Sequence, residues 1–293
     1  MRIGVVVDAS CDLPQAFFQE HDISILPISI RLGDETVVDE REPGVTRKFY
    51  TEQLAAKGLS AETTAFSAEQ IRAKFLDRIV VDYDYVFCIT ITSTRSPIFE
   101  NATRASFAIL NDYKSIRAQA GVVGPFALRV VDSKSMFCGT GVLAAEAAIL
   151  ARAGESPNTI RRRLDDLRAL LCGYMVPSDL YSIRARGKKK GENSVGLFTY
   201  AIGSALDITP VIPCYQAETK PVAKILGYDR AVEKMFTHVA QQIEKGISTQ
   251  HVCISYGGEA EHIAKLPGYT VLEAVAREHK IRILSSVMSA TAA

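Results

Sequence analysis

The sequence predicts an α/β protein of two domains, the first built on a mainly parallel sheet and the second on a mixed sheet. Short β-branched runs that end in polar residues alternate with longer stretches of helical period, which is typical of βα units. The chain has 293 residues, of which 47% are hydrophobic and 23% charged. A chain of this length and composition buries sizeable cores without disulfides or metals.

The first half alternates strands and helices in a regular way. Apolar β-branched runs predict strands at residues 3–7, 23–30, 85–91 and 127–131. Apolar residues at helical spacing predict helices at residues 14–20, 46–56, 67–78, 97–113 and 139–153. Ser67 with Gln70 three residues later forms a capping box that supports the helix starting there.

A domain boundary is predicted at Ala153–Pro157, where a glycine helix stop meets a new helix start with Ser156 as N-cap. We therefore expect domains at 1–155 and 156–293. In the second, the same patterns predict helices at 158–171, 228–245 and 258–266 and strands at 251–256 and 280–286. Residues 209–216 and 222–226 are expected to form an antiparallel pair.

Composition excludes several classes of protein. The 34 Lys and Arg residues balance 33 Asp and Glu residues, which argues against a basic nucleic-acid binder. No stretch approaches the roughly 18 apolar residues of a membrane span, and Asp8 and Asp12 interrupt the N-terminal run before it could serve as a signal-peptide core. The six widely spaced cysteines contain no CxxC pair, so we expect reduced, packed thiols in a cytoplasmic protein.

Polar residues follow each main strand of the first half, where ligands of open parallel sheets bind. They are Asp8 to Ser10, Thr92 to Ser96, and Asp132 with Ser133. Ser96-Pro97 predicts the start of a long helix, with Ser96 as N-cap and Pro97 as the first helical residue. That helix end suits a carboxylate or phosphate, although Ser96 could equally be only a cap.

Two further groups of residues leave alternatives open. Thr63 and Thr64 lie in an expected loop before the Ser67 cap, and capping does not explain them. Asp8 and Asp132 could act as an acid/base pair, or could make the turn hydrogen bonds usual for a carboxylate that closes a strand.

Standard catalytic motifs are absent from the sequence. It contains no GxSxG, GxxxxGK[ST], GxGxxG, HExxH or EF-hand pattern, and its five histidines lack metal-ligand spacing. The Lys188 to Lys190 run is interpreted as a solvated loop. We therefore expect no metal and no cofactor.

Several segments, taken in order, resemble the DegV family of bacterial fatty-acid-binding proteins. They are Val7 to Pro14, Leu26 to Ile28, Thr63 to Ser67, Ser96 to Ala102, Val131 to Ser133 with Gly139 and Gly141, Tyr174 to Leu180, Gly187-Lys188, and Ala205 to Ile212. The resemblance implies two α/β domains with a long-chain fatty acid buried in an apolar tunnel between them. It also implies that Thr63 and Ser96 hold the carboxylate, with Thr64 and Pro97 beside them in the lipid-binding set.

The chain also departs from the family pattern. Pro97 and Ile98 stand where the family has Gly and Thr, which removes an amide donor and a hydroxyl. Leu226 and Lys188 replace arginines, and the family's C-terminal His-Thr-Gly-Pro-Gly segment is missing. The resemblance implies a fatty acid kinase as partner for some members. These departures weaken the expectation of kinase docking more than the expectation of lipid binding.

The leading hypothesis is a cytoplasmic, non-enzymatic carrier of a long-chain fatty acid, monomeric or weakly associated. The alternative is an enzyme that acts on a small phosphorylated or carboxylated substrate through Asp8 and Asp132. A third hypothesis is a regulatory protein with a vestigial pocket. Pocket shape separates a carrier from an enzyme, because a carrier needs a long dry channel and an enzyme a compact polar cleft.

Overall fold

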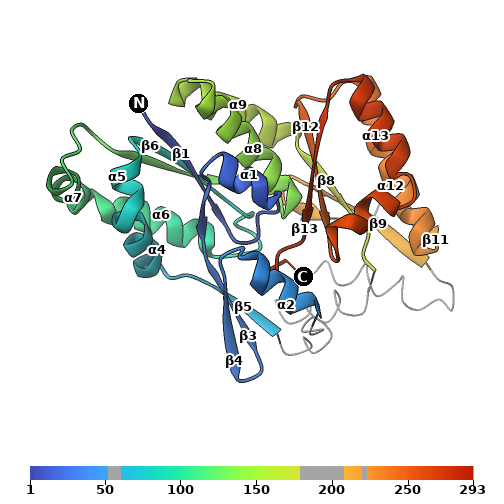
Figure 1. The fold of residues 1–293 in the computed structure, drawn as a ribbon, viewed down its shortest axis with the longest axis horizontal. Coiled ribbons are helices and arrows are strands. Elements are labelled where there is room, and N and C mark those ends of the chain that lie inside the picture. Colours follow the sequence, from blue (N-terminus) through green and yellow to red (C-terminus); the bar gives the residue numbers. More distant parts are fainter. Residues whose placement is uncertain (52–60, 179–207, 220–222, 293) are drawn as a thin grey trace.

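A computed structural model describes residues 1–51, 61–178, 208–219 and 223–292 of the chain (Figure 1). The Lys188 to Lys190 run, Gly187 and the first residues of the Ala205 to Ile212 segment lie outside the described residues. The predicted α/β class is confirmed, with one parallel sheet in the first half and separate antiparallel and parallel pairings elsewhere. In the described part of the chain, no helix is long and apolar enough to cross a membrane.

A four-stranded parallel sheet forms the centre of the first half, in the order β2-β1-β6-β7. Its strands are β1 (Ile3–Asp8), β2 (Ser24–Leu26), β6 (Tyr85–Thr90) and β7 (Ala127–Asp132). Successive side chains of β1 point to opposite faces, and both Val6 and Val7 are fully buried. Both faces of this sheet are therefore covered, as is usual for parallel sheets.

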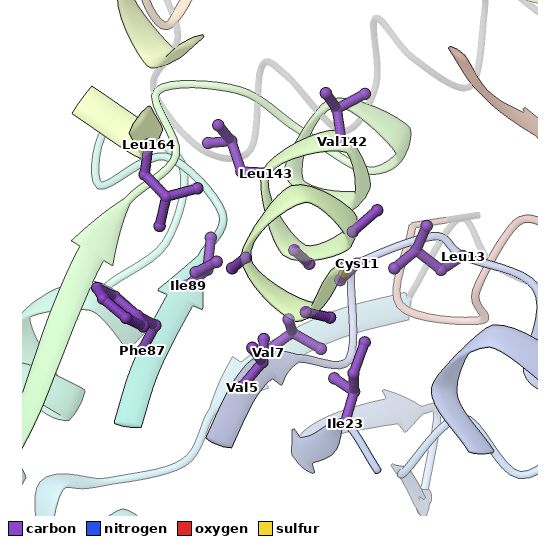
Figure 2. Packing of buried hydrophobic residues seen from close by; sticks show 14 of the residues in the cluster. Val5, Val7, Cys11, Leu13, Ile23, Phe87, Ile89, Val142, Leu143 and Leu164 are labelled. Atoms are coloured by element: carbon purple, nitrogen blue, oxygen red, sulfur yellow. The ribbon is translucent and has the colours of Figure 1, made fainter. Parts of the chain in front are cut away.

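Two layers of helices cover the sheet. On the face of Val7 and Phe87 lie α1 (Gln15–Glu20), α8 (Cys138–Arg152) and α9 (Pro157–Leu170). Figure 2 shows side chains of β1 and β6 packed against α8. On the opposite face lie α4 (Ala68–Lys74), a π-helical turn (Phe75–Ile79), α5 (Val80–Asp82), α6 (Ile98–Ala108), a 3-10 turn (Ile109–Asn111) and α7 (Tyr113–Gln119).

A smaller antiparallel sheet extends from the first half, in the order β4-β3-β5 (Figure 1). Its strands are β3 (Ile28–Leu32), β4 (Glu35–Asp39) and β5 (Ala61–Ala65), and α2 (Pro43–Thr51) follows β4. The single strand predicted at 23–30 is wrong, because it breaks at Pro27 and its two pieces join different sheets. Proline has no amide to donate to a strand ladder, so it ends the pairing there.

The described residues of the second half form two separate sheets. Strand β9 (Ile208–Tyr215) pairs antiparallel with β8 (Cys172–Met175), β10 (Glu218–Thr219) and β11 (Ala223–Leu226), which confirms the predicted pair at 209–216 and 222–226. Strands β12 (His251–Tyr256) and β13 (Arg282–Val287) are parallel. Helices α12 (Tyr228–Lys245) and α13 (Tyr269–Glu278) pack together, and the helix predicted at 258–266 is only a 3-10 turn (Ala260–Lys265).

The first-half core continues into later parts of the chain. Ile160, Leu164 and Leu167 of α9, with Cys253 of β12 and Leu284 of β13, belong to the same buried cluster as β1 and α8. As the sequence indicates, Ser156 caps α9 by accepting a hydrogen bond from the Thr159 amide at 3.2 Å. The division into domains at 155/156 stays a prediction.

Helix α8 approaches the loop after β1 so closely that position 141 has no room for a side chain. A Cβ atom on Gly141 would lie 2.6 Å from the backbone oxygen of Asp12. We expect Gly141→Ala to lower the free energy of unfolding by about 1 to 3 kcal/mol, because backbone must shift to relieve the overlap. Urea denaturation measures this change.

Gly44→Ala is the matched control, since Gly44 lies in α2 and a Cβ atom there meets no atom within 4 Å. Alanine is the better helix former, so the control should keep or slightly raise stability. Equal stability of the two variants would contradict the proposed close approach.

Candidate functional site

Three loops meet at the carboxyl ends of the parallel strands, as the sequence predicts. The Ile91 amide, after β6, donates to Asp8 Oδ2 at the end of β1 at 2.6 Å. The Ser93 hydroxyl donates to Asp132 Oδ2 at the end of β7, also at 2.6 Å. These bonds join the loops after β1, β6 and β7 into one rim that carries hydroxyls.

Asp8 and Asp132 hold turns in this rim. Asp8 accepts hydrogen bonds from the Ser10 amide, the Ser10 hydroxyl and the Ile91 amide. Burial raises the pKa of Asp8, and these bonds oppose the rise. Asp132 accepts from the amide and hydroxyl of Ser93 and from the Lys134 amide. Each carboxylate is engaged by its own turn and by the loop after β6, which favours a structural role over an acid/base pair.

Ser96 lies immediately before α6, where the sequence predicts a helix start. Its hydroxyl oxygen accepts a hydrogen bond from the Ile98 amide at 3.3 Å. Pro97 occupies the N-cap position and α6 begins at Ile98, so the prediction that Pro97 is the first helical residue is wrong by one. A hydroxyl that accepts from an amide still carries a proton, which it can donate to an anion. Ser96 is half-buried and Pro97 is exposed.

Thr63 and Thr64 lie in strand β5, so the expectation that they occupy a loop is wrong. Thr63 pairs with Ile30 and Thr64 with Ser29 of β3, and both threonines are exposed. Their side chains point to opposite faces because they are consecutive in a strand. The loop prediction failed because the partner strand β3 is distant in sequence, and pairing with it overrides the local preference.

Two hydrogen-bonding arrangements connect the end of β5 with the helices around it. The predicted capping box is confirmed, because the Gln70 amide donates to Ser67 Oγ at 3.3 Å and the Ser67 amide to Gln70 Oε1 at 2.9 Å. The Asn101 side chain of α6 donates to the Phe66 carbonyl at 2.9 Å. This bond joins α6 to the residue that follows β5.

A buried ion pair that no sequence motif predicts lies beside this rim. The Arg41 guanidinium donates to Asp12 Oδ1 at 2.9 Å, and these side chains are 7% and 0% exposed. Ser255 Oγ and the Ser289 amide also donate to Asp12, at 2.5 and 2.9 Å. Burial raises the pKa of Asp12 to about 6, although the charge of Arg41 lowers it. All these partners are far from Asp12 along the chain, so no local motif could reveal them.

The same cluster holds the end of the chain against the first half. The amide and hydroxyl of Thr291 donate to Asp39 Oδ2 at 2.9 and 2.7 Å, and Tyr50 donates to the Met288 carbonyl at 3.1 Å. Figure 1 shows the C-terminus beside α2. This C-terminal segment is therefore fastened to residues of the first half.

Five of the six cysteines are poorly suited to act as nucleophiles. All six lie within the described residues and are unpaired. Burial raises the pKa of the Cys138 thiol to about 12 and raises those of Cys11, Cys88, Cys214 and Cys253 as well. Protonated thiols are poor nucleophiles. In the described part of the chain, no group of histidines, cysteines and carboxylates has an arrangement that could hold a metal.

Two surface cavities lie away from the rim. One of about 430 Å³ is lined by Lys114, Arg117, Ala118 and residues 121–124. The other, of about 330 Å³, lies between α4 and α6 and is lined by Ser67, Ala68, Glu69, Arg72, Asn101, Arg104 and Ala108. Neither of these two cavities is lined by Thr63 or Ser96.

Comparison with known proteins identifies the family. The family model described as "Uncharacterised protein, DegV family" matches residues 2–292. The chain belongs to the DegV family. It is 50% identical to a DegV domain-containing protein of Xanthomonas axonopodis pv. citri, over 99% of this chain and 93% of that protein.

Solved structures of the DegV family share the fold. The crystal structure of DegV from Bacillus subtilis, titled a fatty acid binding protein, matches with a TM-score of 0.74 and 21% identity, covering 100% of this chain and 94% of that one. A structure from Eubacterium ventriosum, titled a stearic acid-binding protein, matches with a TM-score of 0.71 and 18% identity, covering 95% and 91%.

Proposed function

We propose that this DegV-family protein binds a long-chain fatty acid as a carrier and has no chemistry of its own. The observation that carries the proposal is Ser96, whose hydroxyl accepts from the Ile98 amide at the start of α6. Its own proton is then available for a carboxylate at the positive end of a helix of 11 residues. The Bacillus and Eubacterium proteins, described as fatty acid-binding and stearic acid-binding, support the class of ligand.

In this proposal Thr63 and Ser96 hold the carboxylate, and Thr64 and Pro97 contact the lipid beside it. The hydrogen bond between Asn101 and Phe66 supports a shared role for Thr63 and Ser96, because it joins α6 to the residue after β5. Pro97 has no amide proton, so the start of α6 offers one donor fewer than a glycine would. The carboxylate therefore depends more strongly on the two hydroxyls.

Affinity in this proposal comes from an apolar tunnel for the acyl chain. Burying about 15 methylenes at roughly 0.8 kcal/mol each contributes on the order of 12 kcal/mol before the costs of association. A charge-assisted hydrogen bond to the carboxylate contributes much less than this burial energy. The hydroxyls therefore select a carboxylate head group, and the tunnel supplies most of the binding energy.

We expect protein purified from a bacterial host to carry about one fatty acid per chain, because a buried acyl chain leaves slowly. Native mass spectrometry, followed by extraction and identification of the lipid, measures the stoichiometry. Spectra that show no bound lipid, combined with no binding of added palmitate, would refute the carrier proposal.

A fatty acid kinase is the proposed partner that would use the bound lipid. The chain departs from the family here, because Leu226 replaces an arginine and is 53% exposed on β11. Mixing the loaded protein with a fatty acid kinase and ATP tests the proposal, with acyl phosphate trapped as its hydroxamate. Acyl phosphate above the level of free palmitate supports the partnership, and no increase refutes it.

A further inference from the structure

The turn between β9 and β10 has a backbone that its own sequence does not favour. It contains two residues, Gln216 and Ala217, because Tyr215 pairs directly with Glu218. Their φ angles are 49° and 66°, so both lie in the left-handed region. Hairpin turns of this kind prefer Asn-Gly, since side chains with a Cβ atom are strained at positive φ. Contacts elsewhere must therefore stabilise this turn.

Those contacts are made with Lys134, in the loop after β7, and with the last turn of α9. The Ala217 amide donates to the Lys134 carbonyl at 2.8 Å, and Lys134 Nζ donates to Gln216 Oε1 at 3.3 Å. Lys134 itself has a φ of 51°, so the backbone is strained on both sides of the contact. The Gln216 side chain also donates to the carbonyls of Arg168 and Ala169, at 2.8 and 3.1 Å, in the last turn of α9.

Two sets of hydrogen bonds connect this hairpin to residues 92–96. We call these residues the head-group loop because they include Ser96. The first passes through the Lys134 amide, which donates to Asp132, the carboxylate that also accepts from Ser93. The second is direct, because Arg95 Nη2 donates to Thr219 Oγ1 of β10 at 2.9 Å. Arg95 precedes Ser96 in the chain.

We propose that the β9–β10 hairpin is a positioning element for the head-group loop, and that Gln216 and Thr219 set the carboxylate affinity without contacting the ligand. The inference rests on the proposed function, since it concerns how Ser96 is placed for a fatty acid carboxylate. The side chain of Gln216 is long enough for its amide group to reach Lys134 Nζ and the carbonyls at the end of α9. Asparagine would suit the turn better but is shorter by one methylene.

The test distinguishes the intrinsic stability of the turn from its hydrogen bonds to α9 and Lys134. In the double variant Gln216→Asn with Ala217→Gly the turn is favoured, whereas the bonds that Gln216 donates to α9 and accepts from Lys134 Nζ are lost. Thr219→Val removes the hydroxyl that accepts from Arg95 Nη2, at nearly constant volume. Ala217→Gly alone is the matched control, because it keeps the amide that donates to Lys134 and relieves the left-handed strain. Binding of palmitate and of hexadecanol is measured for each, with the melting temperature of the ligand-free protein.

We expect the double variant and Thr219→Val each to weaken palmitate binding about threefold to tenfold and to leave hexadecanol within about twofold. Ala217→Gly should bind palmitate like the wild type. Unchanged palmitate binding in both test variants, or equal losses for acid and alcohol, would overturn the positioning role and leave the proposed function standing. A wild type that binds no palmitate would overturn the proposed function and this inference with it.

Discussion

Replacing Arg41 by methionine is expected to lower the free energy of unfolding by about 3 to 5 kcal/mol near pH 8, which chemical denaturation measures. Asp12 is fully buried, and Arg41 is its charged partner at 2.9 Å. Methionine keeps much of the volume and removes the charge, so the variant must hold an uncompensated carboxylate in the core. The bonds from Ser255 and the Ser289 amide remain.

The effect of pH on this variant follows from the pKa of Asp12, which is about 6 in the fold against 3.8 ordinarily. A carboxyl with a raised folded pKa contributes stability that is fully present below its unfolded pKa and is lost as pH rises through its folded pKa. Without Arg41 the pKa rises further, because Arg41 lowers it. Asp12 is then neutral near pH 5, so the loss caused by Arg41→Met should be smaller there than near pH 8.

The matched control removes an arginine from an exposed ion pair. Arg104 and Glu100 are 67% and 64% exposed in α6, so Arg104→Met should cost less than about 1 kcal/mol at either pH. A loss from Arg41→Met no greater than that of Arg104→Met would show that the buried pair does not stabilise the fold.

Ser96→Ala and Thr63→Val are each expected to weaken fatty acid binding by about tenfold to a hundredfold. Each removes one charge-assisted hydrogen bond worth roughly 1.5 to 3 kcal/mol, while burial of the acyl chain remains. A fatty alcohol should bind the wild type more weakly than the acid and should lose less on either substitution, because it has no charge to stabilise. Isothermal titration with acid and alcohol measures both.

Ser156→Ala is the control for Ser96→Ala. Ser156 also accepts from a helix amide, at the start of α9, and its loss should lower stability by about 1 kcal/mol without affecting affinity. If Ser96→Ala lowers the melting temperature like Ser156→Ala but leaves palmitate affinity unchanged, Ser96 is only a cap. Equal losses for acid and alcohol would place the head group elsewhere.

Local patterns were sufficient for three of the four strands of the main sheet of the first half. Residues 3–7, 85–91 and 127–131 are predicted as strands because each is a short apolar run, and each is a strand of the parallel sheet. The capping box at Ser67 and the cap at Ser156 were equally predictable, because each involves residues only three positions apart. Interactions of this range leave a direct signal in the sequence.

Local sequence patterns were enough to predict the α/β class, the family and the hydroxyl-bearing rim at the strand ends. The structure was needed to show that Thr63 lies in a strand beside Ile30, that Arg41 pairs with the Asp12 carboxylate, and that Lys134 bonds the Gln216 side chain. The last two contacts join residues 29 and 82 positions apart. Such contacts form once the chain has closed long loops, and their energy depends on burial and on backbone placed by distant elements, for which neighbouring residues provide no periodic signal.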